Sequence, residues 1–368
     1  MDQLEQARMT IDSVDREMAE LFCKRMKAVE QVALYKQEHG LPILNTKREQ
    51  EVIEKNAALI SDPALQSYYI RFLQDTMAIS RSYQSRLTKG MKVGYCGVEG
   101  AFAHIASGRI FPTARLLSFS DFKDAYQAVC DSECDAAVLP IENSYAGEVG
   151  QVMDLAFSGN LYISGIYELP ITHHLLGLPG TKIQDIRQVV SHPQALSQCA
   201  PYLKEHGLKG VSYANTAMAA QYVVESGDKS LGAIASIETA KLYHLDVLEK
   251  NVNSSRSNTT RFAVFTRTPN KQEEANHSHF ILTYTVKHEA GALAKTIQTI
   301  GKYGFNMCSM RSRPMKALLW QYYFYVEAEG DINTPLGQVM LEELSTLCEQ
   351  LKVCGSFKNH GELQEETC

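Results

Sequence analysis

Two cations, Arg25 and Lys36, lie within the apolar stripe of the first helix that the sequence predicts. The stripe consists of residues that recur at helical spacing and share one face: Ile11, Val14, Met18, Leu21, Phe22, Val29 and Val32. A charge buried without a partner costs several kcal/mol, so a fold keeps one there only beside a compensating group. Either each cation reaches the surface or pairs with Asp or Glu, or both line a pocket for an anion. Two cations on one stripe favour the pocket.

The third predicted helix adds polar groups to the same interior. Ser80 projects from its inward face, and Gln84 lies near the edge of that face. The other residues of the face are Leu65, Tyr69, Phe72, Thr76 and Leu87. Inward polar side chains either bond to a neighbouring helix or contribute donors to a site.

The segment that carries these residues, 1–89, contains one glycine and two prolines, a composition typical of a helical bundle. The first helix is expected to end at about His39, and Thr46 with Glu49 predicts a capping box that opens the second. The third should run from Pro63 to about Leu87. Because three helices of such unequal length bury little alone, we expect an intertwined dimer.

The bulk composition excludes several classes of protein. The chain has 368 residues, enough for two or three domains, and 45% of them are hydrophobic, as in soluble globular proteins. The net charge of -6 does not indicate binding to nucleic acid, and no apolar run is long enough to span a membrane. A signal-peptide pattern is missing, and nine cysteines without disulfide or zinc-site spacing are expected to be reduced. We therefore expect a cytoplasmic protein with no metal, nucleic-acid or membrane partner.

From Gly90 the sequence changes to short apolar strands that alternate with helical segments. The predicted strands are Lys92–Cys96, Leu116–Phe119, Ala136–Pro140, Val189–Val190, Leu231–Ala235 and Phe262–Thr266. This alternation indicates an α/β fold with a mostly parallel sheet. The segment is long enough to divide into two lobes with a cleft between them.

Polar residues of this segment stand where parallel sheets bind ligands. Glu142–Ser144 come directly after one predicted strand, and Ser191 follows another. In open α/β sheets, ligands bind beyond the carboxyl ends of the strands, and helix N-termini there favour anions. We therefore expect the cleft to hold a binding site for an anion.

A polar segment, Thr268–Ser278, is predicted to be a linker to a compact C-terminal unit. The predicted strands and helices of that unit are, in order, His279–Lys287, Ala292–Tyr303, Asn306–Arg313, Leu319–Glu327, Pro335–Gln350 and Val353–Phe357. Their βαββαβ order is that of the α+β ferredoxin-like unit. The expected architecture is multidomain, with an all-α domain over 1–89, a two-lobed α/β domain over 91–267 and the α+β domain over 279–357.

The polar residues of the helical segment together resemble the active site of the all-helical chorismate mutases, over residues 1–88. The match rests on the types and spacing of Arg8, Arg25, Lys36, Arg48, Glu49, Ser80 and Gln84. The resemblance implies that Arg25 and Arg48 bind the carboxylates of chorismate. It also implies that Arg8 arrives from the other subunit.

The reaction of that family suits these residue types. Conversion of chorismate to prephenate is a unimolecular rearrangement, which needs a dianion held in a reactive conformer and donors at the breaking ether bond. By resemblance, Lys36 and Gln84 face the ether oxygen, while Glu49 and Ser80 contact the hydroxyl side. Asn45 stands where bacterial bifunctional members carry Asp, so its contact with the substrate hydroxyl departs from the family pattern.

The middle segment resembles the prephenate dehydratases over residues 91–267. Ser257–Phe262 is similar to the Asn-x-Thr-Arg-Phe signature of that family. Three further segments match in order: Pro140–Ser144, Ile171–His173 and Ser191–Gln194 with Gln198. The implied fold is two-lobed, like periplasmic binding proteins. The loop Gly97–His104 departs from the family because it lacks the usual proline and hydroxyl residues.

The resemblance also implies roles at the dehydratase site. Thr260 donates a hydrogen bond to the departing hydroxyl of prephenate, and Arg261 binds a carboxylate. The other implied substrate contacts are Glu142, Asn143, Ser144, Ser191, Gln198 and Phe262. Glu142 has an alternative role as the carboxylate that caps the next helix. Neighbours on a regular strand point to opposite faces, so the chain must turn at Thr260 for both Thr260 and Arg261 to reach one cleft.

Two motifs of the C-terminal unit resemble those of ACT regulatory domains, over residues 279–357. Gly291-Ala292-Leu293-Ala294 opens a helix, and Ser312-Arg313-Pro314 follows a strand. The resemblance implies that Gly291, Ala292, Leu293, Ser312, Arg313 and Pro314 bind an amino-acid effector. A tight turn without a ligand is the alternative for Gly291. The family carries Glu where this chain has Arg311.

The resemblances together imply a bifunctional chorismate mutase–prephenate dehydratase that forms phenylpyruvate and is inhibited by L-phenylalanine. The expected partners are chorismate, prephenate and L-phenylalanine, in a homodimer or larger homo-oligomer. No cofactor is expected, because aromatisation of the ring drives the dehydratase step. Two alternatives stay open: a dehydratase specific for arogenate, and an amino-acid-sensing binding protein with a degenerate helical arm.

Overall fold

The computed structural model of the chain describes residues 2–255, 257–270, 278–315 and 321–363. The chain forms two compact units, Met1–Lys92 and Val93–Cys368.

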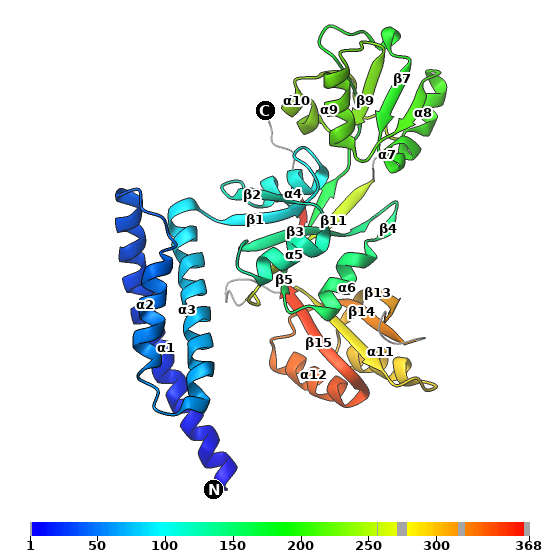
Figure 1. Cartoon of the computed structure of the whole chain (residues 1–368). Helices are drawn as coiled ribbons and strands as arrows, with labels where there is room; N and C mark the ends of the chain where they lie inside the picture. Colours follow the sequence, from blue (N-terminus) through cyan, green and yellow to red (C-terminus); the bar gives the residue numbers. More distant parts are fainter. Residues whose placement is uncertain (1, 256, 271–277, 316–320, 364–368) are drawn as a thin grey trace. The chain divides into compact units, whose positions relative to one another are not determined.

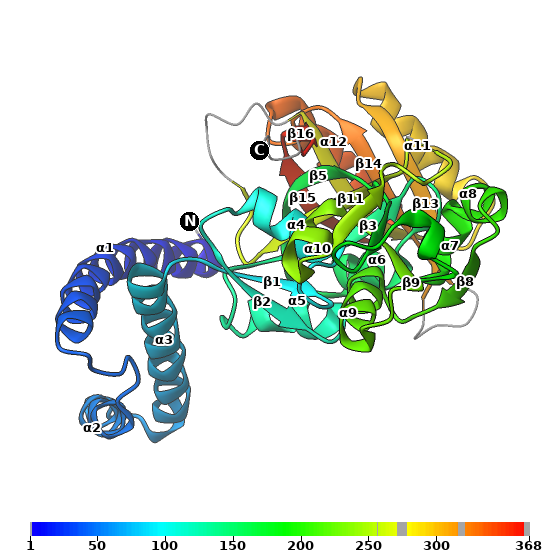
Figure 2. The same ribbon diagram turned by 90° about the horizontal axis from the view of Figure 1, so that it is seen from above.

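Three helices make up the first unit: α1 (Gln3–Glu38), α2 (Thr46–Ala57) and α3 (Pro63–Lys89). α1 and α2 each contact α3. The three helices run alongside one another in Figure 1, and Figure 2 shows them from above. The helix ends agree closely with those predicted. The capping box predicted at Thr46 is wrong, because Asn45 is the N-cap and its Oδ1 accepts a hydrogen bond of 3.0 Å from the Arg48 N–H. Glu49 is therefore free of the cap and pairs with Arg81 at 2.5 Å.

The apolar stripe of α1 is exposed in this chain. Leu21 keeps 64% of its surface exposed and Phe22 keeps 43%, whereas Ala33 is the buried residue of the helix. On α3, Leu65 and Phe72 are exposed as well. Within one chain, the three helices therefore leave one side of α1 uncovered.

The second unit contains a first lobe built on a sheet with the strand order β16-β5-β11-β3-β1-β2, with β4 paired to β3. Its strands are β1 (Lys92–Cys96), β2 (Arg115–Phe119), β3 (Ala136–Asn143), β4 (Gly147–Glu148), β5 (Tyr162–Pro170), β11 (Thr259–Thr266) and β16 (Asn359–Glu362). The helices of this lobe are α4 (Phe102–Ile110), α5 (Phe122–Cys130) and α6 (Gly150–Ser158).

The second lobe has its own sheet, with the strand order β10-β6-β9-β7-β8 (Figure 1, green elements). Its strands are β6 (His174–Gly177), β7 (Gln188–Ser191), β8 (Lys209–Ser212), β9 (Leu231–Ala235) and β10 (Asp246–Glu249). Its helices are α7 (Pro193–Gln198), α8 (Ala200–Glu205), α9 (Thr216–Ser226) and α10 (Ile237–Tyr243), with a 3₁₀ turn at Ile183–Asp185.

The expectation of a mostly parallel sheet is wrong, because both sheets are mixed. β1 pairs with β3, and β7 with β8 and β9, in parallel. β11 lies between β3 and β5 and is antiparallel to both. The reason is the connection between the lobes: the chain leaves the first lobe along β5 and returns to it along β11.

A third sheet follows in the order β13-β14-β12-β15, in which neighbouring strands are antiparallel. Its elements are β12 (His279–Val286), α11 (Ala292–Lys302), β13 (Asn306–Pro314), β14 (Tyr322–Glu329), α12 (Pro335–Leu347) and β15 (Cys348–Phe357). The predicted βαββαβ order is found here. Part of the predicted linker (271–277) and the predicted start of the third strand (319–320) lie outside the described residues.

This third sheet, which we call the C-terminal sheet, shares a hydrophobic core with the first lobe. Buried residues of β3, β5, β11, α5 and α6 form one cluster with residues of the C-terminal sheet, namely Ile281, Tyr325, Cys354 and Phe357. At Gly355 the two sheets are so close that a Cβ atom would lie 2.0 Å from the carbonyl oxygen of Ile163. The chain then returns to the first sheet, where β16 pairs with β5. The C-terminal sheet is therefore packed against the lobe that precedes it.

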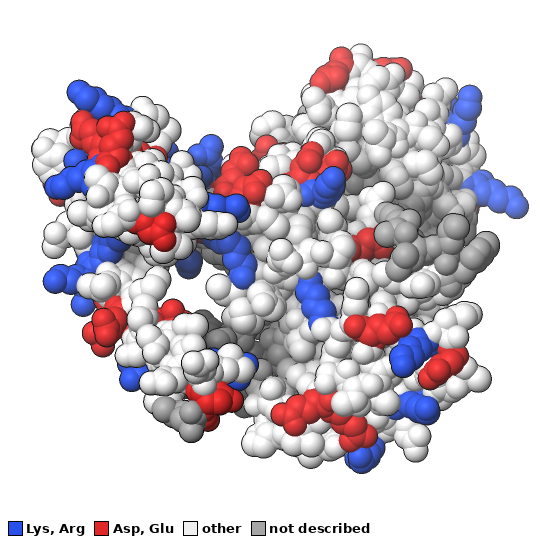
Figure 3. All heavy atoms as spheres, turned by 60° about the horizontal axis from the view of Figure 1, so that its bottom comes forward, with Lys and Arg blue, Asp and Glu red and all other residues white. Residues whose placement is uncertain are grey.

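On the face drawn in Figure 3, basic and acidic side chains are interspersed and form no large patch of one sign. No helix among the described residues combines the length and the hydropathy needed to cross a membrane.

Candidate functional site

A cleft of about 310 Å³ lies between the two lobes of the second unit. Of the residues predicted to form the dehydratase site, Asn143, Gln198 and Thr260 line it. Other lining residues are Phe102, Glu148, His173, His192, Gln194, Asn215 and Asn258. The ends of strands β3 and β11 bring Asn143 and Thr260 together, because the two residues are paired in register.

A directed chain of hydrogen bonds fixes the amide groups in the cleft. The N–H groups of Tyr145 and Ala146 donate to Asn143 Oδ1 at 3.0 and 2.8 Å, so Asn143 Nδ2 must face the other way. Asn143 Nδ2 donates to Thr260 Oγ1 and to Asn258 Oδ1, at 2.9 Å each. Because the Thr260 oxygen accepts from Asn143, its hydroxyl proton is available to donate to a molecule in the cleft.

The same chain sets the tautomer of His173. Asn258 Nδ2 donates to Gln198 Oε1 at 3.0 Å, which makes that oxygen the acceptor for His173 Nε2 at 2.9 Å. His173 therefore carries its proton on Nε2. Its Nδ1 has no hydrogen-bond partner among the described residues. Burial lowers the pKa of His173 to about 4, so the ring is neutral at pH 7.

His173, His192 and Gln194 lie in the family motifs of this sequence, but they are not among its predicted site residues. Gln194 Nε2 donates to Asn143 Oδ1 at 3.2 Å, which adds a link between the lobes. The signal that could have found them was the position of each motif at the end of a strand. Ala101 and Phe102, from the loop that departs from the family pattern, also line the cleft. The rings of Phe102 and His173 meet edge to face, with centroids 5.7 Å apart.

Three predicted site residues have structural roles outside the cleft. Ser191 is fully buried and donates to the carbonyl of Ile234 at 2.6 Å. Ser144 ties the strand ends together by donating to the carbonyl of Ser257 at 3.0 Å. Phe262 is a core residue with 2% exposure. None of the three is among the residues that line the cleft, because Ser191 and Phe262 are buried elsewhere and Ser144 is bonded to the chain that precedes β11.

Arg261 and Glu142 also lie on the side of the sheet that faces away from the cleft. Arg261 donates to both carboxylate oxygens of Glu327 on β14, at 2.9 and 2.6 Å. Glu142 is paired with Arg311 of β13 at 2.7 Å rather than capping a helix. Arg261 is not among the residues that line the cleft, because Thr260 and Arg261 are neighbours on β11 and point to opposite faces; the shift in register with β3 comes only after Arg261.

The predicted residues of the helical unit gather only in part. The Arg25 guanidinium donates to Ser80 Oγ. Gln84 is buried about one turn of α3 beyond Ser80, and its Oε1 lacks a partner among the described residues. Lys36 is half-buried and donates to the carbonyl of Ile43 at 2.5 Å. Arg8 is exposed on α1.

The predicted site residues Asn45 and Arg48, at the start of α2, are engaged with groups of α2 itself. Arg48 is exposed and pairs with Glu51 at 3.3 Å, while Asn45 is occupied as the N-cap of α2. Lys36 and Asn45 line a shared surface pocket. Among the described residues, Arg25 of α1 and Ser80 of α3 are therefore the two predicted mutase residues that a hydrogen bond joins across different helices.

The predicted effector residues lie at one end of the C-terminal sheet. Gly291 precedes α11 in the left-handed conformation, at φ +82°, which favours glycine. Ala292 is buried and Leu293 packs on the core of this segment. Ser312 and Pro314 are exposed at the end of β13. The Arg313 side chain instead turns to the first lobe, where it pairs with Glu148 at 2.6 Å and Asp154 at 2.9 Å.

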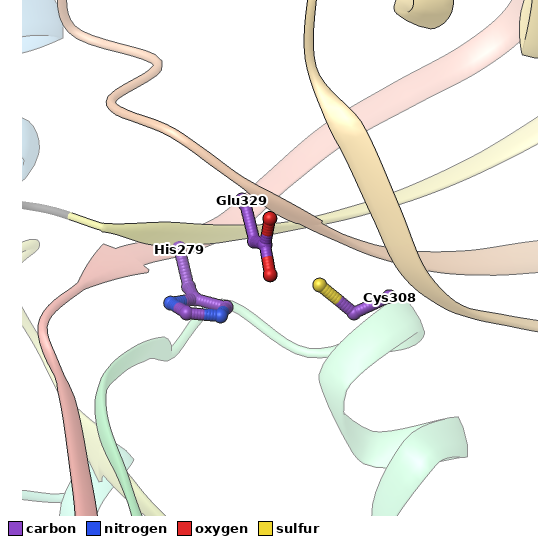
Figure 4. A group of neighbouring side chains, drawn as sticks. All are labelled: His279, Cys308 and Glu329. Atoms are coloured by element: carbon purple, nitrogen blue, oxygen red, sulfur yellow. The ribbon is translucent and has the colours of Figure 1, made fainter.

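One group of possible metal ligands occurs among the described residues. His279, Cys308 and Glu329, on adjacent strands of the C-terminal sheet, place their donor atoms within 4.8 Å of one another (Figure 4). Burial and the nearby Glu329 carboxylate raise the pKa of the Cys308 thiol. This disfavours the thiolate form that binds metals. None of the three residues is among those that line the cleft.

Comparisons with known proteins agree with this division. The model of the family chorismate mutase type II matches residues 7–85, and that of prephenate dehydratase matches residues 93–270. A bifunctional chorismate mutase/prephenate dehydratase of Aquifex aeolicus (strain VF5) is 30% identical over 364 residues, which cover 97% of this chain and 98% of the relative.

Two further relatives match the second unit. The chloroplastic arogenate dehydratase/prephenate dehydratase 1 of Arabidopsis thaliana is 32% identical over 281 residues, or 73% of this chain and 72% of the relative. The crystal structure of a prephenate dehydratase from Arthrobacter aurescens in complex with L-Phe superposes with a TM-score of 0.68. It shares 25% identity and covers 73% of this chain and 90% of the other.

Proposed function

We propose residue roles for two reactions on the premise that this chain belongs to the family of bifunctional chorismate mutase/prephenate dehydratases. The chain converts chorismate to prephenate and prephenate to phenylpyruvate in phenylalanine biosynthesis, and L-phenylalanine inhibits it. The observation that carries the second activity is the Thr260 hydroxyl, which lies in the cleft with its proton free to donate.

In the dehydratase reaction, carbon dioxide and the ring hydroxyl of prephenate leave together. Thr260 donates to the departing hydroxyl, and a threonine hydroxyl does so as a hydrogen-bond donor rather than as a tuned acid. Asn143 holds the Thr260 oxygen, and Gln198 is one link of the same chain. His173 offers a neutral Nδ1 acceptor, which suits a substrate hydroxyl and cannot serve as a cation for the carboxylates.

The mutase site is proposed to form between two copies of the helical unit. Arg25 and Ser80 meet on the inner side, and Gln84 keeps an unpaired acceptor beside them. The exposed stripe of α1 supports an intertwined dimer, because covering it requires apolar surface that one chain does not supply. In that dimer, Arg8 and Arg48 bind the carboxylates with Arg25, while Lys36 and Gln84 face the ether oxygen.

Phenylalanine is proposed to bind at the end of the C-terminal sheet, in a ferredoxin-like ACT domain over 279–357. The left-handed Gly291 and the exposed Ser312 and Pro314 support this placement. The side chain of Arg313 is engaged by Glu148 and Asp154, so we assign it no direct contact with the effector. The dehydratase domain occupies 91–267 and the mutase domain 1–89.

A cytoplasmic location is proposed from the cysteines. The described cysteines form no disulfide, and Cys134, Cys199 and Cys354 are buried within apolar clusters. Reduced thiols of this kind are typical of a reducing compartment.

One set of assays tests these assignments. Purified protein is offered chorismate, prephenate and arogenate separately, and products are separated by chromatography. We expect turnover of chorismate and of prephenate. Preference for arogenate over prephenate would favour the amino analogue as substrate. Calorimetry with L-phenylalanine tests the effector site, and absence of binding to the intact chain would refute it.

A further inference from the structure

Strand β11 carries two kinds of side chain on its two faces. Thr260 lines the cleft, and the next residue, Arg261, lies on the reverse face. The neighbouring strand β3 repeats this arrangement with Asn143 in the cleft and Glu142 behind it. The register pairs Thr260 with Asn143 and Arg261 with Glu142. Each cleft residue therefore has a charged neighbour, one residue along its strand, on the opposite side of the sheet.

The charged residues form a row across three strands. Arg261 lies between Glu142 of β3 and Glu168 of β5, with ion-pair distances of 3.5 and 3.9 Å. The register of both strand pairs places these three residues directly opposite one another. A row of alternating charge on adjacent strands holds their relative positions.

The C-terminal sheet completes this row. Glu327 of β14 is 2% exposed and binds Arg261 through two hydrogen bonds of 2.6 and 2.9 Å. Arg311 of β13 binds Glu142 at 2.7 Å. Bidentate carboxylate–guanidinium pairs have a narrow geometry, so they fix position as well as charge. A shift of β13 or β14 is thereby passed to β3 and β11.

A second contact runs beside the first. Arg313 of β13 binds Glu148 at 2.6 Å, and Glu148 also lines the cleft. Gly150 allows this approach, because a Cβ atom there would lie 2.2 Å from the guanidinium. The ion pairs of the C-terminal sheet thus reach the cleft at both β3–β11 and β4.

We propose that Arg261 and Glu142 are positioning residues of the dehydratase reaction, through which Glu327 and Arg311 of the C-terminal sheet set the placement of Thr260 and Asn143 in the cleft. The proposal rests on the proposed function of Thr260 as the donor to the leaving hydroxyl. Because that contact strengthens in the transition state, a small displacement of Thr260 lowers kcat more than it changes KM. The same ion pairs connect the C-terminal sheet to the cleft, so a ligand bound to that sheet can affect the reaction. An effector acts only by favouring one of two arrangements of the protein.

The contacts to be broken differ in burial, which decides the choice of variants. Removing one partner of the buried Arg261–Glu327 pair leaves an uncompensated charge and endangers folding. Arg311 is more exposed, with 36% of its side chain accessible, so Arg311→Met is the main variant and Glu327→Gln the second. Arg311→Lys keeps the charge. Lys302→Met is the matched control, because it breaks an ion pair of 2.7 Å with Glu343 inside the C-terminal segment.

All variants are made in the full chain, and kcat and KM for prephenate are measured beside chorismate turnover and thermal unfolding. For Arg311→Met we expect kcat to fall about tenfold with KM within about twofold. Arg311→Lys should recover most of kcat, and Lys302→Met should match the wild type. Glu327→Gln, where it folds, should lose at least as much as Arg311→Met.

Unchanged kcat in Arg311→Met, with or without a lower unfolding temperature, would reduce the ion pairs to structural contacts and overturn the proposal. A rise in KM at constant kcat would do the same. If the wild-type chain did not turn over prephenate, or if that turnover did not depend on Thr260, the proposed function itself would be refuted instead. Inhibition by phenylalanine gives a separate readout: it should weaken in Arg311→Met while calorimetric binding of phenylalanine persists.

Discussion

Asn143 donates a hydrogen bond of 2.9 Å to the Thr260 hydroxyl across two antiparallel strands, and two backbone N–H groups fix the amide that does so. Because the Thr260 oxygen accepts from Asn143, the Thr260 hydroxyl can donate its proton to another acceptor. Thr260 is therefore a hydrogen-bond donor toward the cleft.

Thr260→Val tests the role of Thr260 as a donor, because the variant removes the hydroxyl and nearly keeps the shape of the side chain. We expect phenylpyruvate formation to fall about 10²-fold or more, the scale of losing one preorganised donor. Chorismate turnover should be unchanged, so prephenate should accumulate in a coupled assay. Thr260→Ser is the matched control and should keep most of the rate. A normal rate in Thr260→Val would assign proton donation to another group.

Arg25→Ala and Lys36→Ala test the mutase assignment. Each removes a cation from the inner side of the helical unit, and chorismate turnover should fall about 10²-fold or more. Dehydration of supplied prephenate should persist in both. Lys24→Ala, at an exposed position beside Arg25, serves as the control. Near-wild-type chorismate turnover in the Arg25 and Lys36 variants would contradict the mutase assignment.

His173 predicts a pH dependence of stability. Burial lowers its pKa from 6.5 to about 4 in the folded protein, so the unfolded chain binds more protons at this residue between these values. The stability of the second unit should therefore fall as pH falls through this window, by about 3 kcal/mol at most from this residue. His173→Gln should flatten the dependence measured by urea unfolding between pH 4 and 7. The same substitution at the exposed His206 should leave it intact.

Truncation after Thr268 tests the shared core. The cut removes Ile281, Tyr325 and Phe357 from the cluster that also holds β3, β5 and β11. Loss of this apolar cover should lower the unfolding temperature and the dehydratase rate together, because the cleft strands lose their support. Chorismate turnover should be retained, since the helical unit is separate. A stable truncated chain with full dehydratase activity, relieved only of inhibition, would show that the C-terminal sheet is dispensable for the cleft.

The sequence by itself determined the helices and strands with local causes. The apolar spacing of α1, the proline at the start of α3 and the βαββαβ order of the last segment all follow from periodicity and turn residues. The resemblance of Ser257–Phe262 to a family signature also pointed to Thr260, and the position of Asn143 directly after a predicted strand pointed to that residue. What it did not determine was how the apolar face of α1 is covered, and the three helices leave that face exposed.

Only the tertiary structure decided which side of each strand faces the cleft. Alternation along β11 dictates that Thr260 and Arg261 point to opposite faces, yet the sequence is silent on which face meets the second lobe. That depends on β11 entering between β3 and β5, and on the C-terminal sheet packing behind them. The tautomer of His173 likewise follows from partners 25 and more residues away. Local periodicity sets relations within a strand, whereas long-range pairing assigns its faces to solvent, core or cleft.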